Sequence, residues 1–94
     1  MAQLKTPKQM ERHVKGVANH RRIQILLLIA ERGGITLGNI AAAVDTSDRT
    51  VGEHVRRLTQ AGLIDKRHRG RFVEHTLSPY GRLFVRFLKS FQQS

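Results

Sequence analysis

The sequence predicts a mainly α-helical fold with one small β-hairpin, in the element order α-α-β-α-α-β-β-α. Apolar residues recur at spacings of three and four over several segments, which is the pattern of amphipathic helices. Serine, threonine, asparagine or proline stands where these segments begin, and glycine stands where two of them end. Two short alternating segments flank Gly70, which is typical of a hairpin.

The first two helices are predicted from their start signals. In Thr6-Pro7-Lys8-Gln9, a cap residue precedes a proline at the first helical position and a glutamine at the third, which starts a helix over residues 7–18. Asn19 caps a second helix, in which residues 23–30 are apolar nearly all round, as in a buried central helix. Gly33-Gly34 ends it.

The third and fourth helices are predicted to lie on either side of a tight turn at Asp45-Thr46. Ile35 forms a strand of one or two residues, and Thr36 caps a short helix over residues 37–44. The fourth helix spans residues 47–61. Its buried side is formed by Val51, Val55 and Leu58, at spacings of four and three.

A hairpin and one more helix complete the chain. Residues 63–67 and 72–77 alternate between apolar and polar side chains, so we expect two strands joined by the polar segment 68–71. Ser78-Pro79 then starts a last helix over residues 79–92. One face of this helix is apolar, and the opposite face carries Arg82, Arg86 and Lys89.

The charge balance predicts a polyanionic partner. The chain has 17 Lys and Arg against 7 Asp and Glu, a net charge of +10, and 12 of the 17 cations are arginine. Arginine donates in bidentate fashion to phosphate and guanine, so nucleic acid is favoured over a membrane surface. There is no cysteine, which excludes disulfides and thiolate chemistry and fits a reducing, cytoplasmic location. The longest apolar run, residues 23–30, is far too short to span a bilayer.

Two short helices around a tight turn, followed by a hairpin, make a winged helix-turn-helix. Over residues 14–91 the chain resembles the ArsR-type small winged-helix repressors, and the neighbouring MarR-type family shares much of the pattern. The segments that carry the resemblance are Ala18-Asn19-His20-Arg21-Arg22-Ile23-Gln24-Ile25-Leu26, Ser47-Asp48-Arg49-Thr50-Val51, Ala61-Gly62-Leu63-Ile64, Arg69-Gly70-Arg71-Phe72-Val73 and Leu77-Ser78-Pro79-Tyr80-Gly81. The resemblance implies a transcriptional repressor that binds double-stranded DNA as a homodimer.

The chain departs from the metal-sensing members of that family. Their cysteines lie on the helix before the reading helix, and residues 37–39 contain no metal ligand. A second family site uses His, Asp or Glu on the last helix, and residues 79–94 contain none of the three. The five histidines show no paired spacing typical of zinc. We therefore expect a regulator without a metal or other cofactor.

The fourth helix is the predicted reading helix. With its buried side at Val51, Val55 and Leu58, about 100° per residue places four residues on the far side: Arg49, Glu53, Arg56 and Gln60. An arginine that pairs with guanine contributes about 1 to 3 kcal/mol of base discrimination. Alternatively, the arginines contact phosphates or form ion pairs with Glu53. Arg49 and Arg57 each lie four residues from Glu53, at the i,i+4 spacing of such pairs. Glu53 itself either orients arginines or reads cytosine.

Four further residues on or before this helix are candidates. Thr50 contacts a thymine methyl group or a phosphate, or else serves the first helical turn. Gly52 costs about 1 kcal/mol relative to alanine, which hints at close approach of DNA or of the preceding helix. Ser47 is a weaker phosphate candidate beside its cap role, as is Thr36 on the third helix.

The hairpin is the predicted wing. Its cations lie within six positions around Gly70: Lys66, Arg67, Arg69 and Arg71. A solvated charged turn is the ordinary interpretation of such a cluster. Because it follows the reading helix closely, contact with phosphates or a narrow minor groove is favoured, with Arg69 and Arg71 at the tip. Arg21 and Arg22 are weaker phosphate candidates that alternatively just flank a buried helix start.

The terminal helices, residues 7–18 and 79–92, are the predicted dimerisation elements. Their apolar faces consist of Met10, Val14, Val17, Leu83, Phe84, Phe87, Leu88 and Phe91. The alternative is that both helices fold back onto their own core. The family resemblance favours dimerisation, and two protomers would read two half-sites about one DNA turn apart.

Two other function classes are alternatives to sequence-specific DNA binding. A protein-interaction module would dock an acidic partner on the arginine face, and a nucleic-acid binder without sequence preference would use the same charges. An enzyme is not expected, because no catalytic residue is found: cysteine is absent, the seven carboxylates are scattered, and Ser47 and Ser78 have the sequence context of helix caps.

Overall fold

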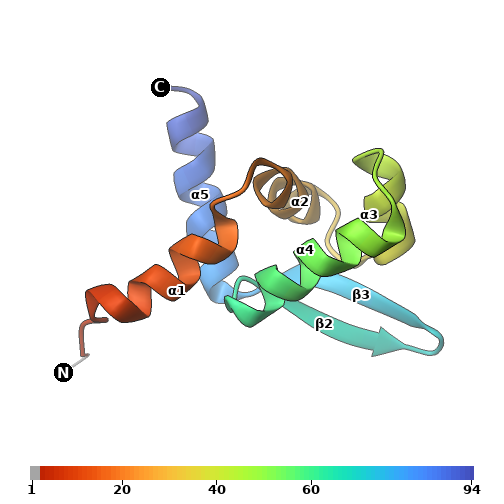
Figure 1. Ribbon diagram of the computed structural model, residues 1–94, viewed down its shortest axis with the longest axis horizontal. Helices are drawn as coiled ribbons and strands as arrows, with labels where there is room; N and C mark the ends of the chain where they lie inside the picture. Colours follow the sequence, from red (N-terminus) through yellow and green to blue (C-terminus); the bar gives the residue numbers. More distant parts are fainter. Residues whose placement is uncertain (1–2) are drawn as a thin grey trace.

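The computed structural model describes residues 3–94 and has the predicted element order, so the winged helix-turn-helix prediction is confirmed (Figure 1). The elements are α1 Pro7–Val17, α2 His20–Glu31, β1 Ile35–Thr36, α3 Leu37–Ala43, α4 Asp48–Gln60, β2 Ile64–Arg69, β3 Phe72–Leu77 and α5 Pro79–Gln92. In this view α4 runs diagonally between α2 and the β2–β3 hairpin, and the hairpin extends away from the helical body.

Most of the predicted helix caps are confirmed. The Thr6 hydroxyl accepts from the Gln9 amide while the Gln9 side chain accepts from the Thr6 amide, a complete capping box. The Asn19 side chain accepts from the amides of Arg21 and Arg22 at the start of α2. Thr36 is an exception, because it holds the cap position of α3 but its hydroxyl makes no cap hydrogen bond.

The three strands form one antiparallel sheet in the order β1-β3-β2. The hairpin is longer and its turn tighter than predicted, because Arg69 pairs with Phe72 and only Gly70 and Arg71 remain in the turn. Gly70 has φ +59° at the first turn position, where a type II′ turn needs glycine. The predicted strand over 63–67 and loop over 68–71 are therefore wrong at their shared boundary: β2 runs from Ile64 to Arg69.

The core lies between α2, α4 and the sheet. Ile25, Leu26 and Ile29 of α2 lie buried at the centre of this core, as predicted for a central apolar helix. The fully buried large side chains are Ile25, Leu26, Ile29, Ile40, Leu58, Leu63, Ile64, Val51 and Val55. Val17 of α1 and Val85 of α5 join this cluster from the terminal helices.

Two buried histidines tie elements to the core through hydrogen bonds. The His13 Nδ1 of α1 lies 2.6 Å from the Ala61 carbonyl oxygen after α4, and the His75 Nδ1 of β3 donates to the Ile35 carbonyl at 2.8 Å. Burial lowers the pKa of His75, and the positive charge of Lys66 adds to that effect, whereas the hydrogen bond to Ile35 raises it. The fold therefore favours the neutral form of His75.

Two glycines allow helices to approach their neighbours closely. A side-chain carbon at Gly16 of α1 would collide with the Ala61 methyl group, and one at Gly81 of α5 would collide with the Leu63 backbone. Gly52 of α4 is different, because nothing lies within 4 Å of the place where its Cβ would be. The α1–α4 contact therefore depends on the missing side chain of Gly16.

Gly16→Ala is expected to destabilise the fold by about 1 to 3 kcal/mol, because α1 must move away from Ala61. The matched control is Gly52→Ala in α4, which gains helix propensity in open space and should add up to about 1 kcal/mol. Urea unfolding of the two variants and the wild type measures both effects. Equal stability of the two variants would contradict the close α1–α4 packing.

His75 is expected to make the fold less stable as the pH falls. Its folded pKa is lowered from 6.5, so below about 6.5 the unfolded chain binds the extra proton and the free energy of unfolding decreases. Above that pH the contribution of neutral His75 to the free energy of unfolding is fully present. His75→Asn keeps a donor for the Ile35 carbonyl and should show a shallower loss between pH 7 and 5. The control is His68→Asn on the exposed hairpin, which should keep the wild-type slope.

Candidate nucleic-acid interface

The rotation of α4 about its axis is fixed by one buried side. Val51, Val55 and Leu58 are at most 1% exposed, so α4 cannot turn without breaking the core. The four residues predicted on the far side, Arg49, Glu53, Arg56 and Gln60, are all exposed. Ser47 caps the helix by accepting from the Thr50 amide, and its hydroxyl donates to the Thr50 hydroxyl. The outer face of α4 is thus a rigid, polar surface open to solvent.

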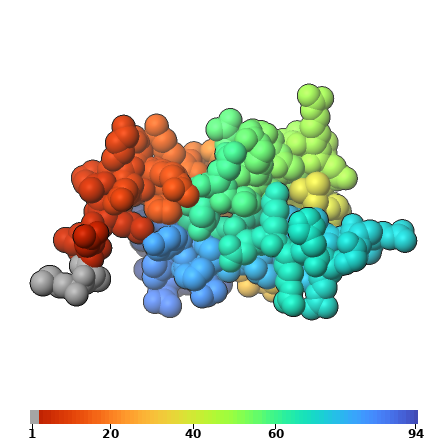
Figure 2. Space-filling view, turned by 90° about the horizontal axis from the view of Figure 1, so that it is seen from below, coloured from red at the N-terminus to blue at the C-terminus, as the bar shows by residue number. Residues whose placement is uncertain are grey.

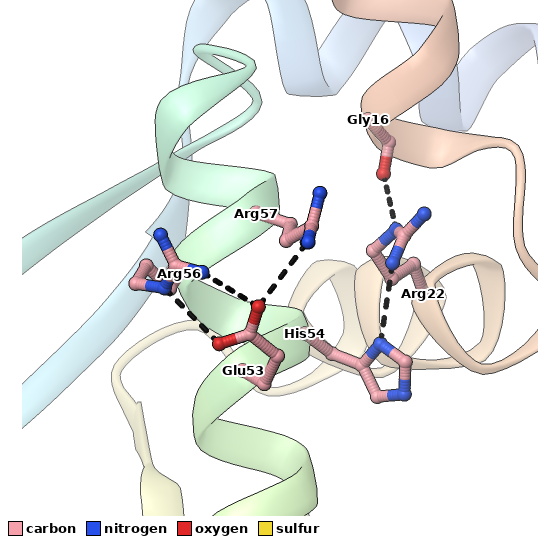
Figure 3. Close-up of polar contacts among 6 residues, drawn as sticks. All are labelled: Gly16, Arg22, Glu53, His54, Arg56 and Arg57. Carbon is pink, nitrogen blue, oxygen red and sulfur yellow. Dashed lines mark hydrogen bonds and ion pairs between the residues drawn. The ribbon is translucent and has the colours of Figure 1, made fainter.

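Glu53 sits at the centre of this surface and binds two arginines (Figure 3). The Arg56 guanidinium donates to both carboxylate oxygens, with Nη2 at 2.6 Å and Nε at 3.1 Å. The Arg57 Nε donates to Oε1 at 3.2 Å. The hydrogen bond from Arg56 lowers the pKa of the Glu53 carboxyl, and the same bond raises the pKa of Arg56.

The predicted pair between Arg49 and Glu53 does not form. Glu53 binds its i+3 and i+4 neighbours, Arg56 and Arg57, instead. Within residues 3–94 Arg49 makes no ion pair, and its side chain is exposed near the start of α4. Arg49 therefore presents an unpaired guanidinium to the solvent, whereas Arg56 and Arg57 are shared with a carboxylate.

Gly52 lies on the flank of α4 with open space around it. The suggestion that the preceding helix approaches it is wrong, because no atom of the described chain comes near its missing Cβ. Close approach by an external partner stays a prediction.

The hairpin projects beyond the body of the molecule as a narrow finger (Figure 2). Cross-strand partners share a face of the sheet, so Arg67 and Arg69 lie on the face of Glu74, and Lys66 lies on the opposite face with His75. The Arg69 Nε is 3.4 Å from Glu74 Oε1. Arg71 occupies the turn. The wing thus carries cations on both faces and at the tip, with only Arg69 paired among the described residues.

Arg21 and Arg22, the weaker phosphate candidates, hold helices together. Arg21 donates to the Val44 carbonyl at the end of α3, and Arg22 Nε donates to the Gly16 carbonyl at the end of α1 at 2.7 Å. The Arg22 Nη1 also lies 3.4 Å from the His54 Nδ1. Burial and then the charges of Arg22 and Arg21 lower the pKa of His54. Both arginines stabilise the junction of three helices, which is more than flanking a helix start.

The terminal helices share an unpartnered apolar face. Phe87 and Phe91 of α5 are 61% and 65% exposed and stack on each other, and Leu83, Met10 and Val14 are also exposed. Val17 was wrongly assigned to this face, because it is 6% exposed and packs in the core. Phe84 and Leu88 are half-buried against the same core. A hollow of about 230 Å³ runs between α1 and α5 and includes Lys5, which lies 4.5 Å above the Tyr80 ring.

Sequence reasoning missed three residues at these surfaces. Tyr80 and His13 line the α1–α5 hollow, with tilted rings whose centroids are 4.9 Å apart. The Arg12 Nε donates to the Gln60 carbonyl at the end of α4. Both contacts join segments far apart in the sequence, so no local pattern predicts them. Within residues 3–94, no group of three or more potential ligand side chains could hold a metal, and no helix has the length and apolarity needed to cross a membrane.

The comparisons with known proteins agree on a helix-turn-helix transcriptional regulator family. A profile described as a helix-turn-helix domain matches residues 17–67. Two relatives come from Escherichia coli (strain K12). The HTH-type transcriptional repressor CsqR is 42% identical over 52 residues, which is 55% of this chain and 20% of CsqR. The arsenical resistance operon repressor is 32% identical over 66 residues, 70% of this chain and 56% of the repressor. The chain thus spans less than two thirds of these relatives.

Similarity to solved structures extends over nearly the whole chain, as one example shows. It is the solution NMR structure of Mb0332 from Mycobacterium bovis, described as a homodimeric winged helix-turn-helix DNA-binding domain and a possible ArsR-family transcriptional regulator. The likeness covers 99% of this chain and 91% of that one, with a TM-score of 0.82 and 25% identity.

Proposed function

The chain belongs to the ArsR-type winged helix-turn-helix regulators, and on that premise we propose that it binds double-stranded DNA as a homodimer and represses transcription. The observation that carries the proposal is the joint exposure of the α4 arginine face and the cationic hairpin. Both project from one core as rigid elements, and the Escherichia coli relatives are named as repressors. The proposal includes a cytoplasmic location, where the DNA is, and no enzymatic activity.

The outer face of α4 is assigned to the major groove. A helix fits this groove, and arginine pairs with the O6 and N7 of guanine. Arg49 is the first choice for base reading because its guanidinium is unpaired, and Thr50 and Gly52 lie beside it at the start of α4. Arg56 and Arg57 are assigned to phosphates or to a second base, since Glu53 already holds them.

The wing and the helix junctions are assigned to the DNA backbone. Lys66, Arg67, Arg69 and Arg71 form a cationic strip that can follow phosphates or enter a narrow minor groove. Thr36, with a hydroxyl that caps nothing, and Ser47 contribute weaker phosphate contacts. Dimerisation is assigned to the exposed face formed by Met10, Val14, Leu83, Phe87 and Phe91. Two-fold pairing through this face covers apolar side chains that a monomer leaves in water.

Arg49→Ala is expected to lower preference for one base pair in each half-site, with a discrimination loss of about 1 to 3 kcal/mol. Arg69→Ala should weaken all duplexes alike and reduce the slope of log affinity against log salt by about one. Competition binding with single-base variants of a selected site measures both. The control is Arg86→Ala on α5, which should behave as wild type. Equal effects of Arg49→Ala on every duplex would reassign that residue to the backbone.

Glu53→Gln is expected to tighten binding to unrelated duplexes, because Arg56 and Arg57 become free for phosphates. The slope of log affinity against log salt should become steeper by about one to two. Glu11→Gln is the matched control, since it removes an equally exposed carboxylate paired with Lys15 on α1. Filter binding at several salt concentrations compares the variants. If both substitutions act alike, net charge alone explains them. If Glu53→Gln weakens only the selected site, Glu53 reads a base.

Phe87→Asp is expected to convert the protein to a monomer and to abolish binding to a two-half-site duplex, because it puts a charge into the centre of the exposed apolar face. Lys89→Glu on the opposite flank of α5 changes the charge without touching that face. Sedimentation velocity measures the oligomeric state. A Phe87→Asp variant that sediments as a dimer would contradict dimerisation through α5.

A further inference from the structure

A cationic hollow lies at the junction of α1, α2 and α4, to the side of the outer face of α4. It has a volume of about 340 Å³, and four cationic side chains line it: Arg12, Lys15, Arg22 and Arg57. No carboxylate is among the described residues that line it. Glu11 and Glu53 do not line the hollow, and each forms an ion pair with one of its cations, Lys15 and Arg57.

Three guanidinium groups around the hollow are fixed in the same manner. The Arg12 Nε donates to the Gln60 carbonyl at 3.2 Å, the Arg22 Nε to the Gly16 carbonyl at 2.7 Å, and the Arg57 Nε to Glu53 at 3.2 Å. The two carbonyls belong to the C-terminal ends of α4 and α1, where partial negative charge favours a cation. Anchoring through Nε leaves the terminal nitrogens of Arg12 and Arg57 available as donors within the described chain.

The floor of the hollow is rigid. Gly16 packs directly against Ala61, so α1 and α4 meet without an intervening side chain. Figure 3 shows Arg57 from α4 and Arg22 from α2 extending toward each other across the space between their helices. Both side chains carry positive charge, so an anion bound in the hollow would be attracted by both. The arrangement is therefore preorganised for an anion.

We infer that this hollow binds a phosphate group. Planar guanidinium forks match the oxygens of phosphate, and convergence of several forks suits a tetrahedral anion with more than one charge. The volume is roughly ten times the ~30 Å³ share of one water molecule, so a phosphate group fits. The group is either a backbone phosphate of bound DNA, which extends the footprint past the C-terminal end of α4, or part of a small phosphorylated effector.

Titration with inorganic phosphate, followed by NMR, tests the site without DNA. The expected result is saturable shifts of the Gly16 and Ala61 amides and of the arginine Nε–H signals, against sodium chloride at equal ionic strength. Arg12→Gln and Arg57→Gln should each weaken phosphate binding about tenfold, as loss of a charged hydrogen bond implies. Arg86→Gln on α5 is the control. Unsaturable shifts spread over all basic surfaces, or Arg12→Gln binding phosphate like the control, would overturn the proposal.

A second arm identifies the source of the phosphate. With a selected duplex, Arg12→Gln should reduce the salt slope by about one if the occupant is a DNA phosphate. An unchanged slope, together with lost phosphate binding, assigns the hollow to a free phosphorylated ligand. Saturable phosphate binding by a protein that binds no duplex would contradict the proposed function and leave this site in place, so the two proposals fail separately.

Discussion

The burial of one side of α4 is the constraint on which the rest depends. Val51, Val55 and Leu58 pack against α2 and the sheet, and their complete burial sets the direction of every other side chain of the helix. A rotation of one residue, about 100°, would take an apolar side chain into water and a charged one into the core. The outward direction of Arg49, Glu53 and Arg56 is therefore a consequence of core packing. The hairpin follows α4 by three residues and is held by pairing with β1, so helix and wing keep a fixed relation.

Electrostatics organises this surface more finely than net charge. A chain with a charge of +10 repels itself, and the fold distributes the repulsion by giving several arginines acceptors of their own. Arg12, Arg21 and Arg22 each bond to a carbonyl at or just beyond a helix C-terminus, and Arg56 and Arg57 share Glu53. These bonds fix the guanidinium groups in place before any ligand arrives, which reduces the entropy lost on binding. Arg49, Lys66, Arg67 and Arg71 make no ion pair within the described chain, so they are free to meet a partner.

Much of the fold could be predicted because its signals are local. Caps at Thr6, Asn19 and Ser47 and the apolar spacing in α4 each lie within a few residues, and all are confirmed. The failures need tertiary information. The predicted turn over residues 68–71 is too long, because strand register and not composition decides that Arg69 pairs with Phe72. The spacing of Val17 fits an exposed apolar stripe and a buried core position equally well. Glu53 pairs with Arg56 at i,i+3 spacing and not with Arg49. The junction of Gly16 with Ala61 joins residues 45 positions apart and gives no pattern in the sequence.

Selection of bound sites from random duplexes tests the central claim most directly. If α4 enters the major groove in both protomers of a two-fold dimer, the enriched sequences should contain an inverted repeat with half-site centres about 10 base pairs, or a multiple of that, apart. Guanine should be enriched at a fixed position in each half-site, as an arginine contact requires. Recovery of duplexes without any shared sequence, or no recovery at moderate salt, would contradict base reading by α4 and favour docking of an acidic protein on the arginine face.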